Sequence, residues 1–306
     1  MRTCGIDTLR VRLPFQAISK LKKEKELKAW VNIDTGELGD YLVWDENALK
    51  VVIKGDLYGY MIFSVPRMIR GTNNAYLTLE GIVKSLDSIT DQLGLSIRDW
   101  RVENIEFGMD IKLSLSSSQV LSFILSYRHH DFGVFSDRLV GQGKVLSLNE
   151  YSVKFYDKGK ELGLHYADIL RMEVRIKKTR KISRDGKPVF VRDIETPACH
   201  EELLKSLLKV WEHVEIVDDS LFQFAKENEA QELEFWFNPV AVNRLRAMDH
   251  KRYMARYNRY RKLVKRLRKK GPNLHSQIKE TIRQGVRQDT DLCFHHLDQG
   301  CRSDHK

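Results

Sequence analysis

Three segments of the chain alternate apolar and polar residues with the period of a β-strand. They are IEFGMDIKLSL (residues 105–115), YSVKFY (residues 151–156) and LRMEVRIK (residues 170–177). Successive side chains of a strand point to opposite faces, so each segment separates its residues into an apolar and a polar side. This pattern constrains the fold to a sheet with one face covered by helices and one face left open.

If the three segments share a sheet, its open face collects carboxylates, cations and a tyrosine. The set is Glu106, Asp110, Lys154, Tyr156, Glu173 and Arg175. Carboxylates hold hard divalent cations such as Mg²⁺ or Mn²⁺, and such a cation polarises a phosphodiester. Neighbouring lysines favour a phenolate, whose ordinary pKa of about 10 otherwise opposes attack at neutral pH. A solvated, non-reactive sheet face is the more common cause of such a pattern, and the residues alone leave both readings open.

The order of the expected elements favours an α+β fold with a mainly antiparallel sheet, helices on one face and an open catalytic face. Strands dominate the first half of the chain, and NAYLTLE (residues 74–80) also alternates. Helical spacing occupies residues 82–93. The segment SSQVLSFILSYRHH (residues 117–130) predicts a further helix with Ser117 or Ser118 as its N-cap.

The composition changes near Glu195, where Thr196 and Pro197 are typical of the start of a helix. Helical patterns then continue to Lys270. We therefore predict three parts: a catalytic domain (1–195), a helical C-terminal domain with a basic arm (196–270), and a polar tail (271–306) that we expect to be flexible.

The positive charge of the chain is concentrated in one segment. The net charge is +10, and residues 243–270 hold 13 Lys and Arg against the single acid Asp249. The remainder has 39 basic and 41 acidic residues, or −2. A basic block on a near-neutral body points to a polyanion, most often a nucleic acid. A solvated charged helix is the alternative.

That basic segment predicts an amphipathic helix with three tyrosines on its apolar side, at positions 253, 257 and 260. The tyrosines either pack against the protein body or stack on bases. The cationic side supplies our candidate DNA-binding residues, which are Arg252, Arg256, Arg259, Lys262, Lys265 and Arg266.

The chain has the features expected of a cytoplasmic protein. No apolar run approaches the roughly 18 residues of a membrane span, and arginines and Asp7 interrupt the N-terminal segment where a signal peptide would be apolar. The cysteines at 4, 199, 293 and 301 form no disulfide framework, which fits a reducing compartment.

Five segments, in this order, resemble the gene II/X-type replication initiators of filamentous phages and their plasmid relatives. They are IDTLRVRLPF, AYLTLEGIVKSL, IEFGMDIKLSLS, VKFYDKGKEL and LRMEVRIKKTRK, between about residues 5 and 190. FYDKGKE is more distantly similar to the initiators of small Gram-positive rolling-circle plasmids.

The resemblance implies a site- and strand-specific DNA nickase and strand transferase that starts rolling-circle replication. Tyr156 would attack a phosphodiester at the origin, giving a 5′-phosphotyrosine and a free 3′-OH primer, and Lys158 and Glu161 would position the DNA. The resemblance also implies host helicase and polymerase partners. The leading ligands for Mg²⁺ or Mn²⁺ are Asp110 and Glu173, the weaker ones are Glu106 and Asp7, and the residues expected on DNA near the tyrosine are Lys154, Arg171 and Arg175.

The sequence departs from nucleases that place two histidines two residues apart on a strand. His129 and His130 are adjacent and would point in opposite directions, so we do not expect them to bind metal. A second tyrosine three or four residues from Tyr156 is also missing, which favours a single-nucleophile cycle.

Two other functions remain open. A non-catalytic DNA-binding replication regulator would use the same basic arm. An RNA-binding protein with a sheet platform would need exposed aromatics on the open face, where the pattern shows charges.

Overall fold

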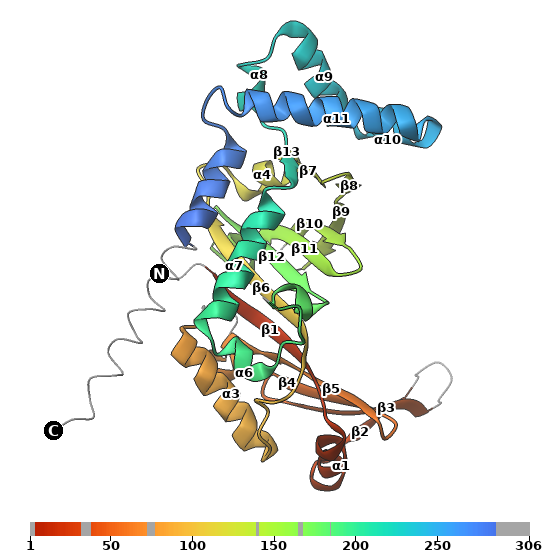
Figure 1. Cartoon of the computed structure of the whole chain (residues 1–306), viewed down its shortest axis with the longest axis vertical. Helices are drawn as coiled ribbons and strands as arrows, with labels where there is room; N and C mark the ends of the chain where they lie inside the picture. Colours follow the sequence, from red (N-terminus) through yellow and green to blue (C-terminus); the bar gives the residue numbers. More distant parts are fainter. Residues whose placement is uncertain are drawn as a thin grey trace, which may run out of the picture.

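The computed structural model describes residues 4–31, 38–71, 77–138, 141–164, 168–183 and 185–285. Within these residues, an antiparallel ten-stranded sheet has the order β2-β3-β4-β5-β1-β6-β12-β11-β10-β9 (Figure 1). Its strands are β1 (Cys4–Arg12), β2 (Lys28–Val31), β3 (Leu38–Glu46), β4 (Leu49–Lys54), β5 (Tyr58–Ser64), β6 (Val102–Lys112), β9 (Gly133–Asp137), β10 (Gly141–Ser147), β11 (Tyr151–Asp157) and β12 (Ile169–Ile176). A smaller sheet joins β13 (Val214–Ile216), β7 (Ile124–Tyr127) and β8 (His130–Asp131). The predicted α+β class with a helical C-terminal region is confirmed.

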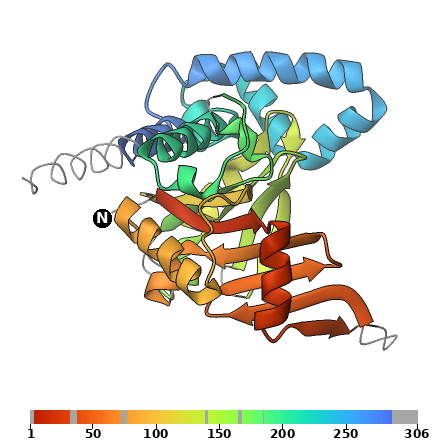
Figure 2. The same ribbon diagram turned by 60° about the horizontal axis from the view of Figure 1, so that its bottom comes forward.

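One face of the large sheet forms the main hydrophobic core. The apolar sides of β6, β11 and β12 are buried together, with Phe107, Phe155 and Met172 at most 1% exposed. Side chains of α1 (Phe15–Glu24), α3 (Leu79–Leu93) and α7 (Pro197–Trp211) belong to the same core, and Figure 2 shows α1 and α3 lying on the sheet. The alternation in the three segments therefore separated the faces correctly.

A helix over residues 274–285 belongs to this core, and its presence corrects our expectation of a flexible tail from residue 271. Leu274, Ile278 and Ile282 are buried at helical spacing. Trp211 stacks on the His275 ring and donates a hydrogen bond to the His275 carbonyl at 3.1 Å. Three apolar residues among many polar ones were too weak a sequence signal to predict this packing. Residues 286–306 lie outside the described part of the chain.

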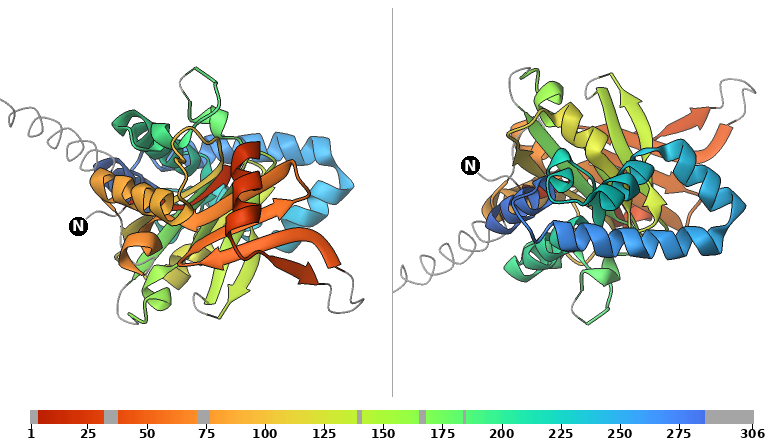
Figure 3. Two further views of the ribbon diagram at one scale, coloured as in Figure 1. Left: turned by 90° about the horizontal axis from the view of Figure 1, so that it is seen from below. Right: turned by 90° about the horizontal axis from the view of Figure 1, so that it is seen from above.

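A second core holds the basic helix. It involves α8 (Asp219–Phe222), α9 (Glu227–Phe237), α10 (Pro239–Met248) and α11 (His250–Leu267). Figure 1 shows these helices as a group at one end of the protein, and in the right view of Figure 3 they lie in front of the sheet. Tyr253, Tyr257 and Tyr260 surround Trp236 and are 2%, 4% and 1% exposed. They therefore pack against the protein, as the first of our two alternatives expected. The side chains of α7 belong to the sheet's core, whereas the second core begins at Val217; the domain boundary near Glu195 remains a prediction.

Two local predictions differ from the structure. Residues 117–130 form α4 (Ser117–Phe123) followed by β7, because pairing with β13 takes over after Phe123; the N-cap is Ser116, in a capping box with Gln119. In the segment 74–80, residues 74–76 lie outside the described part of the chain, and Thr78 caps α3 instead of continuing a strand.

Short helical segments complete the described chain. They are α2 (Val65–Arg70), α5 (Lys158–Glu161), α6 (Val191–Ile194) and the 3₁₀ turn η1 (Thr179–Lys181). Among the described residues, none of the helices has the length and apolar character needed to cross a membrane.

Candidate active site on the open face

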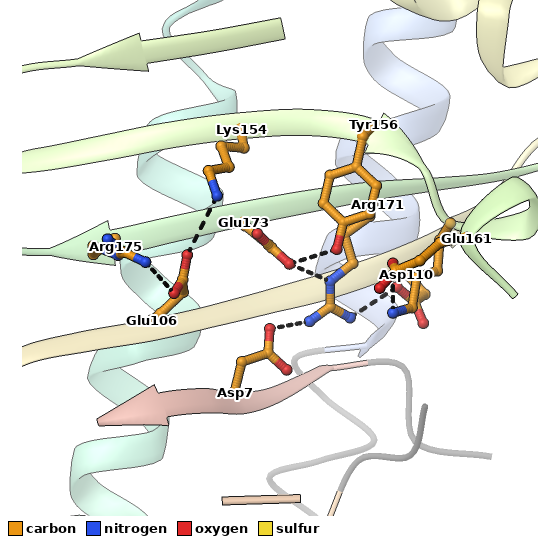
Figure 4. Close-up of polar contacts among 10 residues, drawn as sticks. Asp7, Glu106, Asp110, Lys154, Tyr156, Glu161, Arg171, Glu173 and Arg175 are labelled. Carbon is orange, nitrogen blue, oxygen red and sulfur yellow. Dashed lines mark hydrogen bonds and ion pairs between the residues drawn. The ribbon is translucent and has the colours of Figure 1, made fainter. Parts of the chain in front are cut away.

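Tyr156 lies near the end of β11, on the open side of the sheet. Its side chain is only 7% exposed, and its hydroxyl donates a hydrogen bond to Glu173 Oε1 at 2.7 Å (Figure 4). The register sets this contact: Tyr156 is opposite Arg171 on β12, and Glu173 is its diagonal neighbour two residues further along that strand. The phenol therefore faces a buried carboxylate directly.

Arg171 is the centre of the site. It is 1% exposed and binds carboxylates from three strands. Its Nε donates to Glu173 Oε1 at 3.1 Å, its Nη1 donates to Asp110 Oδ1 at 2.9 Å, and its Nη2 donates to Asp7 Oδ2. A guanidinium carries its donors in a rigid planar fork, so these contacts fix the three carboxylates relative to one another.

Two features of the backbone make room for this arrangement. Gly108 on β6 is opposite Glu173; a Cβ there would lie 3.0 Å from Glu173 Cγ and 3.1 Å from Arg171 Cζ. On β1, the pairing with β6 passes from Ile6 directly to Thr8, so Asp7 is the extra residue of a β-bulge. The bulge turns Asp7 toward Arg171 while its neighbour Ile6 stays in the core.

Lys158 and Glu161 lie beside this cluster on the short helix α5. Lys158 is 3% exposed and binds Glu161 Oε2 at 2.8 Å. Asp157 caps the helix by accepting a hydrogen bond from the Lys160 amide at 2.9 Å. The cap therefore holds the VKFYDKGKEL segment against the end of the strand that carries Tyr156.

Negative charge exceeds positive charge in the cluster. Four carboxylates (Asp7, Asp110, Glu161 and Glu173) accompany two cations (Lys158 and Arg171). Burial raises the pKa of Asp110 to about 7 against the opposing effect of Lys158, and it raises the pKa of Asp7 to about 6 against that of Arg171. Burial would also raise the pKa of Glu173, but the Arg171 charge and the hydrogen bond from Tyr156 outweigh it, so this pKa is lowered.

The phenol is held in its neutral form. Burial first, and then the Glu173 charge and hydrogen bond, raise the Tyr156 pKa well above its ordinary value. We expected lysines to favour the phenolate. In the structure, Lys154 Nζ lies 3.8 Å from Glu106 Oε1, and Lys158 Nζ lies 2.8 Å from Glu161 Oε2. Neither ammonium group therefore binds the phenol oxygen.

The structure brings together only part of the expected metal-ligand set. Asp110 and Glu173 meet at Arg171, together with Asp7, whereas Glu106 binds Arg175 at 2.7 Å and Lys154 on a separate part of the face. Across the described ranges, no group of three or more His, Cys, Asp or Glu side chains is arranged to hold a metal ion. The oxygen donors and the excess negative charge fit a hard divalent cation in chemistry, but the guanidinium of Arg171 lies between them.

The predicted DNA-binding residues divide into three groups. Arg171 is buried among carboxylates, so it cannot reach DNA phosphates as we expected, while Arg175 is exposed and Lys154 half-buried at the rim. On α11, Arg256 binds Glu232 at 2.8 Å, and Arg266 binds Glu229 at 2.5 Å. Of the other predicted residues on α11, Arg252, Arg259, Lys262 and Lys265 are exposed. Figure 1 shows α11 beyond the small β13-β7-β8 sheet, on its side away from β11 and β12.

His129 directly precedes β8 and His130 is its first residue; both are exposed and lie outside the cluster around Arg171. That they are not metal ligands stays a prediction.

Sequence reasoning missed a pair of arginine–tyrosine contacts on the open face. Arg10 on β1 lies over the Tyr60 ring on β5 at 3.7 Å, and Arg12 lies over Tyr58 at 3.9 Å. The sequence signal was present, because YGYMIFS (residues 58–64) alternates. Its tyrosines point to the face of the strand that is opposite to the face of the buried Met61 and Phe63. Our statement that the open face shows charges in place of aromatics is therefore wrong for this half of the sheet.

We compared the chain with protein families, curated proteins and solved structures. No family model matches the chain, and no curated protein matches it. Among solved structures, it is similar to the rolling circle replication initiator protein from Geobacillus stearothermophilus, with 9% identity, a TM-score of 0.35, and coverage of 70% of this chain and 86% of that chain. A TM-score of this size does not establish a common fold.

Proposed function

We propose that this protein is a rolling-circle replication initiator of the phage or plasmid type, acting as a site- and strand-specific DNA nickase and strand transferase. The observation that carries the proposal is the hydrogen bond from Tyr156 to Glu173, whose carboxylate Arg171 holds in place. A nucleophile, a base and a group that orients the base are the parts that nucleophilic catalysis needs. The order of the five segments supports the same function.

In the proposed reaction, Tyr156 Oη attacks the phosphorus of one phosphodiester. Its proton passes to Glu173 as the new O–P bond forms, since the raised pKa of Tyr156 leaves little phenolate beforehand. The bond to the 3′ oxygen breaks, and that oxygen takes up a proton from water to become the 3′-OH primer. In the closing step, a 3′-OH attacks the 5′-phosphotyrosine and releases its proton to water. The bond from phosphorus to Tyr156 Oη breaks, and the proton on Glu173 returns to the phenol.

Other residues would bind the DNA strand. Lys154 and Arg175 lie at the rim of the site, and Arg10 and Arg12 extend positive charge along the same face. Lys158 is buried and binds Glu161. We propose that this ion pair stabilises the segment around Tyr156 and thereby keeps the tyrosine in position.

We also propose a requirement for Mg²⁺ or Mn²⁺. Asp7 and Asp110 would hold the cation in competition with Arg171, which binds both. Glu173 also accepts a hydrogen bond from Tyr156, and Glu106 lies apart. When bound, the cation would polarise an oxygen of the phosphodiester and compensate the excess negative charge.

The test is incubation with supercoiled and single-stranded DNA of the replicon that encodes the protein, in Mg²⁺, Mn²⁺ or EDTA. Metal-dependent nicking with a protein-linked 5′ end, lost in Tyr156→Phe, supports the proposal. Salt-sensitive binding without cleavage in any metal would favour the other candidate, a non-catalytic DNA-binding regulator. The burial of Tyr156 is the observation that favours this alternative. For an active initiator, host helicase and polymerase are the expected partners.

A further inference from the structure

A cavity of about 710 Å³ opens on the helix-covered side of the sheet. Its walls come from the turn between β7 and β8, the start of β11, the end of β12, and α7, which Figure 1 shows crossing this region of the sheet. Tyr151 belongs to its wall, and Tyr156 is five residues further along β11, on the opposite face. A strand rises about 3.3 Å per residue, so the two tyrosines are well separated along β11 as well as by the sheet itself. The cavity is therefore separate from the candidate active site.

The interior of the cavity combines apolar and aromatic walls. Val174, Ile176 and Val210 contribute the apolar part. Tyr127 and Tyr151 stand edge to face with ring centres 5.9 Å apart, and their hydroxyls are linked by a hydrogen bond of 2.8 Å. Tyr151 is the partly exposed member of the pair, and its ring offers contact area to a flat organic group, while the buried Tyr127 holds it in place. An inorganic anion alone would not cover this apolar and aromatic lining, which would stay in contact with water.

The rim of the cavity is positively charged. Its cations are Arg128 from the β7–β8 turn, Lys178 and Lys181 from η1 and its N-cap, and Lys209 from α7, and the one carboxylate in the lining is Glu150. Glu150 binds both Lys178 and Lys181. Within the part of the chain that the structure describes, neither Arg128 nor Lys209 makes an ion pair. Four cations against one carboxylate leave a charge of +3, which favours an anionic ligand.

Arg128 is held at the mouth by an unusual backbone conformation. Its φ is +56°, a left-handed value that non-glycine residues adopt infrequently. Its amide donates to the His213 carbonyl at 2.9 Å, which ties this turn to the end of α7. Conformations of this kind cost free energy and cluster at ligand-binding positions, where the surrounding structure maintains them.

We propose that this cavity binds a nucleoside phosphate, with its phosphate at the cationic rim and its base against Tyr151. A mononucleotide suits a cavity of this volume, since small-molecule sites span roughly 300–1,000 Å³. The ligand is either a free nucleotide or the phosphorylated end of a DNA strand, because both present the same chemistry. The site does not depend on the proposed nicking activity.

The test is calorimetric titration of the full chain with AMP, adenosine and inorganic phosphate. We expect AMP to bind more tightly than either fragment. Lys209→Gln and Arg128→Asn each remove one rim cation, and asparagine tolerates a positive φ. Each should weaken AMP binding about tenfold, the effect of removing one charge-assisted hydrogen bond. Lys205→Gln is the matched control, because Lys205 is exposed on the same helix and binds Glu201 and Glu202 outside the cavity.

Absence of AMP binding, or equal binding by the wild type and Lys209→Gln, would overturn the proposal. Lys209 is exposed, so that variant should fold even if Arg128→Asn does not. Tyr156→Phe should bind AMP like the wild type, which separates this site from the nicking centre. A 5′-phosphorylated oligonucleotide that competes with AMP, while its unphosphorylated form does not, identifies a strand end as the ligand. If neither oligonucleotide competes, the ligand is a free nucleotide.

Discussion

Glu173 Oε1 accepts two hydrogen bonds, from the Tyr156 hydroxyl at 2.7 Å and from Arg171 Nε at 3.1 Å. The acceptor for the phenol proton is thus held in position by a buried cation on its own strand. Arg171 extends the same control to Asp7 and Asp110, so the geometry of the site depends on a single guanidinium.

Tyr156→Phe should abolish nicking and the protein-linked 5′ end, by at least about 10³-fold, because the attacking oxygen is removed. Loss of one hydrogen bond should change the free energy of unfolding by only about 0.5–1.5 kcal/mol. Gel analysis of the DNA ends measures nicking, and urea unfolding measures the change in stability. Tyr151→Phe, on the opposite face of β11, is the control and should nick normally; equal activity of both variants would remove Tyr156 from the mechanism.

Arg171→Gln should lower the free energy of unfolding by about 3–5 kcal/mol, since it leaves three partly buried carboxylates without their shared cation. Urea unfolding at neutral pH measures this. Arg175→Gln is the control, because Arg175 is exposed and its pair with Glu106 should contribute about 1 kcal/mol or less. A similar small effect for both variants would show that Arg171 does not hold the carboxylates together.

Gly108→Ala should destabilise the protein by about 1–3 kcal/mol and reduce nicking. Its Cβ would lie 2.8 Å from the Met172 carbonyl oxygen and would press on both Glu173 and Arg171. Gly133→Ala on β9 is the matched control, since its Cβ would meet nothing closer than 3.5 Å. Thermal melting and the nicking assay compare the two. If Gly108→Ala behaves like the control, the close approach at β6 is not required.

Stability should fall as pH rises from 5 to 8 in the absence of divalent cations. Asp7 and Asp110 have ordinary pKa values of 3.8 and folded-state values of about 6 and about 7, so the folded state binds more protons across this range. Their contribution is present at low pH and is lost as pH passes the folded values, on the order of 2–4 kcal/mol in total. Urea unfolding at several pH values gives the slope.

Asp110→Asn should flatten that slope, and an unchanged slope would assign the pH dependence to other groups. Mg²⁺ or Mn²⁺ should raise the melting temperature of the wild type more at pH 8 than at pH 5, because both carboxylates are ionised at the higher pH. An equal shift at the two pH values would argue against these ligands.

Binding to DNA should depend steeply on salt through α11. Replacing Arg252, Arg259, Lys262 and Lys265 together by glutamine should reduce the slope of log affinity against log salt by up to about 0.7–0.9 for each phosphate that the variant no longer neutralises. Fluorescence anisotropy with a labelled oligonucleotide measures this. Arg256→Gln and Arg266→Gln should have smaller effects, since these residues already bind Glu232 and Glu229. An unchanged slope in the fourfold variant would place the DNA elsewhere.

Much of the fold could be predicted because its signals are local. Alternation in β6, β11 and β12 identified the buried face, and the helical spacing of α3 and α11 identified their apolar sides. The errors occurred where distant segments decide the conformation. Residues 124–127 pair with β13 and form a strand, and residues 274–285 form a helix because Trp211 and its neighbours provide a surface for it.

The candidate site was predictable as a set of residues on one face, but not as a set of contacts. Tyr156, Glu173 and Asp110 were placed on the open side correctly, since alternation fixes the face of each residue. Their partners depend on the register between strands, which the sequence did not reveal. Glu106 was grouped with Asp110 and Glu173 because all three share that face; in the structure it pairs with Arg175 and Lys154.

By itself, the sequence determined that this chain forms a sheet with one apolar and one charged face, a basic helix, and a tyrosine among carboxylates. Periodicity and composition are properties of neighbouring residues. Only the tertiary structure decided that Arg171 lies among Asp7, Asp110 and Glu173, through the bulge at Asp7 and the open space at Gly108. A buried charge requires compensation, and which charge supplies it depends on which strands the fold places side by side.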